Sequence, residues 1–125
     1  MILFLVAMND QIVKICGLKT LEAAEVVVSN GADLLGTILV PNRERTVDLD
    51  TAKAIAALCQ RTRIARKREF VDSKDMMRHL RESKLVGIDW FDYVAKVIIE
   101  NGPFLVGVFR NQSLDEVKAH VEQLG

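Results

Sequence analysis

The sequence lacks several features that would place a protein in a specialised class. Its 17 basic and 17 acidic residues cancel, so no excess of positive charge favours nucleic acid or another polyanion as a partner. Only two cysteines occur, Cys16 and Cys59, and they form neither a CxxC pair nor a metal-ligand spacing. This cysteine usage suggests free thiols in a reducing compartment, and we expect a cytoplasmic protein without a metal site.

Long hydrophobic runs and flexible linkers are also missing. The opening MILFLVAM (1–8) is apolar, but it has no basic segment and no small-residue cleavage site, so it does not resemble a signal peptide. It is also far shorter than the roughly 20 residues that cross a bilayer, so we expect no membrane partner. No stretch rich in Gly, Pro or Ser divides the chain, and 125 residues of which half are hydrophobic predict one domain.

What the sequence does contain is a repeated strand, loop and helix. Apolar segments at 12–16, 34–40 and 104–109 read as strands buried on both faces, which is typical of a parallel sheet covered by helices. Each is followed by a polar loop and an amphipathic segment. Thr20 is placed to cap the first helix, and Ser113 with Glu116 has capping-box spacing at the third. The repeat predicts an α/β fold with right-handed crossovers.

The three units are unevenly spaced. Two segments with helical periodicity lie between the second helix and the third strand. We interpret residues 61–102 as a helical insertion, which begins with the basic run RTRIARKR (61–68). That run has no interleaved aromatic residues, and a solvated helical face explains it better than a nucleic-acid site.

Strand alternation places Lys14 and Cys16 on one face of the first strand. Cys16 ends that strand, and the carboxyl ends of strands carry the active sites of α/β folds. Thiols react as thiolates, and a nearby ammonium increases the thiolate fraction. From the pattern alone, Cys16 can equally be a buried cysteine that fills space.

The loop PNRERTVD follows the carboxyl end of the second strand. It contains Arg43 and Arg45, whose guanidinium groups suit a carboxylate or phosphate. The alternative is a solvated loop whose charges pair with one another. Lys14 and the arginines of this loop, Arg43 and Arg45, are therefore candidate substrate-binding residues.

Together these segments resemble a known family. VKICGL, EAAE, NGADLLG, VPNRERTVD and LVGVFRNQ follow one another in the order and spacing of the first part of phosphoribosylanthranilate isomerase, an enzyme of tryptophan biosynthesis. The similarity covers roughly residues 12–58 and 103–125.

The resemblance implies a (βα)8 TIM barrel and an Amadori rearrangement of N-(5-phosphoribosyl)anthranilate to 1-(2-carboxyphenylamino)-1-deoxyribulose 5-phosphate, without a cofactor. In the family, the cysteine that ends strand one is the general base, and here that position is Cys16. An arginine after strand two helps to hold the anthranilate carboxylate, and Arg45 occupies that position.

A barrel of this type needs about 250 residues and eight units, whereas this sequence supplies three. The family's aspartate acid and its glycine-rich phosphate loops belong to later units. We therefore expect a partial barrel domain over residues 1–125, inactive alone and open to a complementing carboxy-terminal half or to self-association. The alternative is a non-catalytic α/β interaction module derived from the first barrel units.

Overall fold

Three apolar segments pair as a parallel sheet at the positions that the sequence predicts. The computed structural model describes residues 11–125, so the apolar opening lies outside the described residues. The strands are β1 (Lys14–Ile15), β2 (Leu34–Ile38) and β3 (Phe104–Val108), in the order β1-β2-β3. Ile15 pairs with Leu35, and Leu35 pairs with Leu105. The prediction of a parallel α/β fold is confirmed, and each strand is shorter than its apolar run.

A helix follows each strand and begins at a side-chain cap. The helices are α2 (Leu21–Ser29), α3 (Leu49–Ala65) and α6 (Leu114–Leu124). Thr20 accepts a hydrogen bond from the backbone N–H of Ala23 (3.1 Å), and Asp48 caps α3. Ser113 and Glu116 form the predicted capping box. Such caps satisfy backbone donors that have no partner inside the helix.

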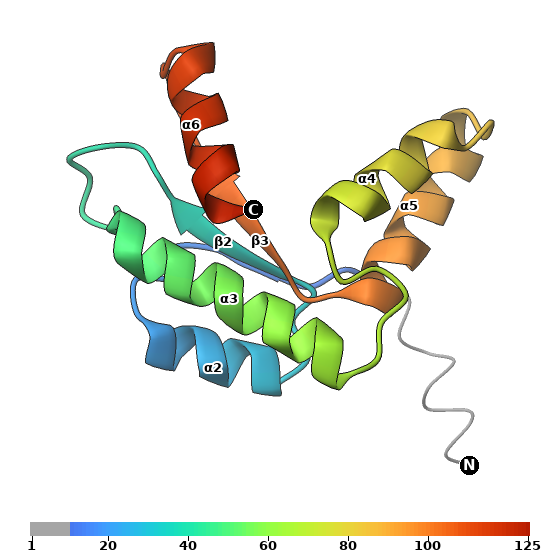
Figure 1. Cartoon of the computed structure of the whole chain (residues 1–125), viewed down its shortest axis with the longest axis horizontal. Coiled ribbons are helices and arrows are strands. Elements are labelled where there is room, and N and C mark those ends of the chain that lie inside the picture. Colours follow the sequence, from blue (N-terminus) through green and yellow to red (C-terminus); the bar gives the residue numbers. More distant parts are fainter. Residues whose placement is uncertain (1–10) are drawn as a thin grey trace.

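The main core lies between the sheet and helices α2 and α3 (Figure 1). Leu35 is fully buried there beside Ala24 and Ile55. Because successive side chains of a strand alternate between faces, Gly36 belongs to the opposite face. Helices α2 and α3 therefore cover the face of the sheet that carries Leu35, and Gly36 lies on the other face.

The expectation that the first strand is buried on both faces is wrong for this chain. Residues 11–16 are all exposed, and Val13 and Ile15 expose 45% and 39% of their surface. The physical reason is position, since β1 is an edge strand that pairs only with β2. An apolar run shows that a strand can be buried, but it does not show whether other elements pack against both of its faces.

Two further helices form an arm beside the sheet. They are α4 (Ser73–Glu82) and α5 (Gly87–Asn101), and the helical arm is defined here as residues 66–102. The arm packs its own core, which includes Met76 and Val97, against Leu34 and Phe104. Those two residues begin β2 and β3, so the arm lies at the amino end of the sheet (Figure 1). The first residues of the predicted insertion, 61–65, continue α3.

Three arginines of the basic run 61–68 bind backbone carbonyls, and the interpretation of the run as a solvated face is wrong for one of them, Arg63, which is buried. Arg63 is only 7% exposed, and it donates to the carbonyls of Val71 (2.8 Å) and Pro103 (2.7 Å). Arg66 donates to Val28 (3.2 Å), and Arg68 donates to Gly102 (3.1 Å). Arginine carries five donors in a fixed plane and can bridge separate segments. These arginines therefore join α3 to its neighbours.

Candidate active site

Cys16 lies at the carboxyl end of β1, where it sits directly against the neighbouring strand. The side chain of Cys16 and the Cβ position of Gly36 are both on the face of the sheet opposite to α2 and α3. A Cβ atom built on Gly36 would lie 2.8 Å from the Cys16 Sγ, which is closer than a carbon and a sulfur can approach without overlap. Cys16 is exposed, so its thiol is accessible from solvent. The alternative of a buried, space-filling cysteine does not hold for this chain.

Arg45 reaches the residue that follows Cys16. Gly17 has a φ of +81°, and a Cβ placed on it would lie 3.1 Å from the Arg45 Nη1 and 3.3 Å from its Cδ. Because Gly17 has no side chain, the Arg45 guanidinium can lie against its backbone. The structure brings Arg45 and the Cys16 region together from two different loops, at the edge where β1 and β2 end.

A lysine strengthens the contact between these loops. The Lys19 ammonium donates to the backbone carbonyl of Glu44 (2.9 Å), the residue before Arg45. Within the loop, Thr46 accepts a hydrogen bond from the backbone N–H of Arg43 (2.9 Å) and pairs with Ile38 as an isolated bridge. These bonds hold the arginine loop against the end of β2.

Lys14, the third candidate residue, is less closely integrated. It lies in β1 two residues before Cys16 and is exposed. Side chains two residues apart in a strand project to the same face, so the side chain of Lys14 leaves β1 on the face that carries Cys16. Among residues 11–125, no hydrogen bond or ion pair involves its side chain.

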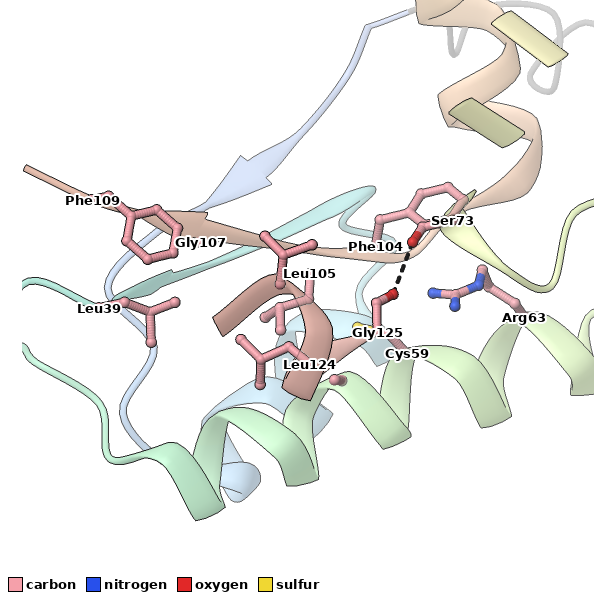
Figure 2. A pocket seen from close by; sticks show the side chains of 12 residues that line it. Leu39, Cys59, Arg63, Ser73, Phe104, Leu105, Gly107, Phe109, Leu124 and Gly125 are labelled. Atoms are coloured by element: carbon pink, nitrogen blue, oxygen red, sulfur yellow. Dashed lines mark hydrogen bonds between the residues drawn. The ribbon is translucent and has the colours of Figure 1, made fainter. Parts of the chain in front are cut away.

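The second cysteine has the opposite environment. Cys59 is 1% exposed, and burial raises the pKa of its thiol to about 11, with the Arg63 charge acting in the other direction. It borders a cavity of about 170 Å³ between α3, β3 and α6, which Figure 2 shows together with Leu39, Phe109 and Leu124. A thiol with such a pKa stays protonated at neutral pH. Cys59 is therefore a core residue, in contrast to Cys16.

The described residues contain neither a cluster of metal ligands nor a helix that could cross a membrane. Across residues 11–125, His, Cys, Asp and Glu side chains do not gather in groups of three that could hold a metal ion. No helix in the same range combines the length and apolar character required to cross a bilayer.

Two residues of the site were not recognised from the sequence. Gly36 lies inside the apolar run LLGTILV, where it reads as part of a buried strand. An isolated glycine in a strand is a signal of close backbone approach, and here the approaching group is Cys16. Lys19 carries no comparable signal, because its partner is a backbone carbonyl 25 residues further along the chain.

Comparison with known proteins identifies the relatives of this chain. Residues 56–125 match the family model described as N-(5'phosphoribosyl)anthranilate (PRA) isomerase. The chain is 46% identical over 114 residues to an N-(5'-phosphoribosyl)anthranilate isomerase of Komagataella pastoris, covering 91% of this chain and 47% of that protein. A Candida albicans protein of the same name is 48% identical over 115 residues, covering 92% and 45%.

A third relative is the multifunctional tryptophan biosynthesis protein of Schizosaccharomyces pombe. It is 33% identical over 118 residues, which represent 93% of this chain and 14% of that protein. No solved structure gives a significant match. The chain spans about half the length of the Komagataella and Candida relatives. With more than half of its residues matched by the family model, the chain belongs to the N-(5'-phosphoribosyl)anthranilate isomerase family.

Proposed function

We propose that this chain supplies the amino-terminal part of a phosphoribosylanthranilate isomerase of tryptophan biosynthesis. The observation that carries the proposal is the position of Arg45 against Gly17, the residue after Cys16, with the guanidinium Nη1 3.1 Å from the Cβ position of Gly17. A base and a cation so placed can act on two parts of one small substrate.

In this mechanism Cys16 is the general base. Its thiolate takes the proton from C2 of the ring-opened sugar, and the electrons of that C–H bond become the C1–C2 double bond while the iminium nitrogen is neutralised. Tautomerisation then gives the ketone. Arg45 holds the anthranilate carboxylate, which a guanidinium binds through two parallel hydrogen bonds. Lys14 adds positive charge on the same face of β1 and is proposed to assist binding of the anionic substrate.

The fold proposed for the complete enzyme is a (βα)8 barrel, of which β1–α2, β2–α3 and β3–α6 form the first three units. The helical insertion between the second helix and the third strand, residues 61–102, contains the arm. Two observations support this assignment: the strands are parallel in sequential order, and relatives are about twice as long as the matched region. Both free cysteines suit a reducing, cytoplasmic setting.

The partner proposed for this chain is a polypeptide that carries the later barrel units. By resemblance, those units contain the aspartate that protonates the ring oxygen and the loops that grip the phosphate. Strands β1 and β3 are the two edges of the described sheet. Unpaired strand edges bind other strands, so self-association is the competing outcome when no such partner is present.

The experiment is a reconstitution. The purified chain is assayed for loss of phosphoribosylanthranilate fluorescence, alone and after mixing with the unmatched carboxy-terminal part of the Komagataella pastoris relative. We expect turnover in the mixture and none from the chain alone, because the reaction needs a general acid and a phosphate-binding site as well as the base. Sedimentation of each sample shows whether the two parts associate. An associated but inactive mixture would favour the interaction-module alternative.

Arg45 is tested in the same mixture. Arg45→Met is expected to raise KM about tenfold or more and to change kcat much less, because a hydrogen-bonded charge pair contributes about 1.5–3 kcal/mol. Arg43→Met is the matched control, since Arg43 is an exposed arginine of the same loop. An equal rise of KM in both variants would indicate general attraction of an anion and would contradict a specific role for Arg45.

A further inference from the structure

We propose that Gly36 is a positioning residue for Cys16: its missing side chain creates the space against β2 in which the thiol lies. The inference rests on the proposed function, because it concerns the general base of that reaction. It adds a residue on the second strand to a site otherwise formed by the ends of strands and by loops.

The register of the sheet places the two residues side by side. Ile15 pairs with Leu35, so the next residues along, Cys16 and Gly36, lie opposite each other. Paired residues of parallel strands project to the same face. A Cβ on Gly36 would lie 2.8 Å from Sγ, 3.1 Å from Cβ and 3.0 Å from Cα of Cys16. Any side chain at position 36 would therefore occupy the volume that the thiol now fills.

Gly36 also fixes the backbone that leaves Cys16. Its carbonyl accepts a hydrogen bond from the N–H of Leu18 (3.1 Å), two residues after the thiol. Leu18 is 6% exposed and belongs to the main core. The chain on both sides of Cys16 is thus held, by pairing with β2 before it and by this bond after it. With its neighbours fixed, the backbone of Cys16 cannot move easily, so an added methyl group at position 36 must displace the Cys16 side chain.

A second glycine of the sheet provides the matched control. Gly107 lies in β3, and its Cβ would lie 3.0 Å from Leu39 Cδ1 and 3.0 Å from Phe109 Cε2. Those atoms are the far ends of side chains, and they lie away from Cys16. Alanine at position 107 therefore introduces comparable crowding in the same sheet without touching the thiol.

The test measures thiol reactivity in the whole chain, which does not require catalysis. Gly36→Ala and Gly107→Ala are treated with iodoacetamide over a range of pH, and each cysteine is quantified by peptide mapping. We expect Gly36→Ala to speed alkylation of Cys16 severalfold and to shift its pH profile, because the methyl group pushes the thiol away from β2. Gly107→Ala should leave Cys16 unchanged. Buried Cys59 reports unfolding, because it reacts only when the core opens.

The outcomes separate positioning from stability and from function. An unchanged Cys16 rate and pH profile in a folded Gly36→Ala chain would overturn the proposal. If Gly36→Ala does not fold, the double variant Cys16→Gly with Gly36→Ala decides: recovery of folding supports the contact, and its absence overturns it. In the reconstituted enzyme, Gly36→Ala should lower kcat about a hundredfold with little change in KM, as expected for a misplaced reacting group. Failed reconstitution would affect only the proposed function, since the alkylation result stands without it.

Discussion

Replacing Cys16 with serine is expected to lower kcat of the reconstituted isomerase by about 10²- to 10⁴-fold, the range that general acid–base catalysis typically contributes. A serine hydroxyl is scarcely ionised at neutral pH, so it offers far less of the deprotonated form that takes a proton from the substrate. Because Cys16 is exposed and the substitution is nearly isosteric, the fold and KM should change little. Steady-state assays at several pH values measure both effects.

The second cysteine is the control for this substitution. Cys59→Ala removes a thiol that is buried in the core and distant from the proposed chemistry. It should retain kcat, although it will unfold at lower denaturant concentration because a buried side chain is shortened. If Cys16→Ser retained full kcat, the base would have to be another group, and the role inferred from the resemblance would be wrong.

Replacing Arg63 with methionine is expected to destabilise the chain by about 3 kcal/mol, because two hydrogen bonds from a charged group are lost and two carbonyls are left without their donor. Arg63 bridges the carbonyls of Val71 and Pro103, and its guanidinium carbon lies 4.6 Å from the centre of the Phe104 ring. Burial lowers the pKa of this arginine, but guanidinium groups remain charged at neutral pH. Urea unfolding measures the loss.

Two comparison variants isolate the cause. Arg61→Met removes an exposed arginine from the same helix and should change the free energy of unfolding by less than about 0.5 kcal/mol. Arg63→Lys keeps the charge but cannot reach both carbonyls with the same geometry, so we expect only partial recovery. Equal stability of the Arg61 and Arg63 variants would show that the bridge between α3 and β3 contributes nothing.

Short local patterns in the sequence predict the helices and strands of the fold. The apolar run around Leu35, the cap at Thr20 and the capping box at Ser113 each depend on a few adjacent residues. Exposure of β1 does not follow in this way. It depends on which elements pack against Ile15, and the residues next to it in sequence do not specify that.

The candidate site also contains residues that the sequence predicts and contacts that only the folded structure shows. Cys16 and the arginine loop were candidates because they lie at strand ends, which meet at one edge of a parallel sheet, and the family resemblance selected Cys16 and Arg45 among them. The packing of Cys16 on Gly36 depends on the register between β1 and β2, which no local pattern specifies. Arg63 was assigned to a solvated run because a buried arginine has the same one-dimensional appearance as an exposed one. Its burial depends on the carbonyl of Pro103, 40 residues away.

The position of the helical arm has a consequence for how this family can vary. The arm packs on Leu34 and Phe104, which begin β2 and β3. Cys16 lies against Gly36, two residues or roughly 6.6 Å further along β2, and Arg45 belongs to the loop that follows this strand. The arm and the proposed reacting groups therefore contact different residues. A longer or shorter arm should leave the proposed site in place, so the connection between α3 and β3 can accept added helices while the carboxyl end of the sheet stays as it is.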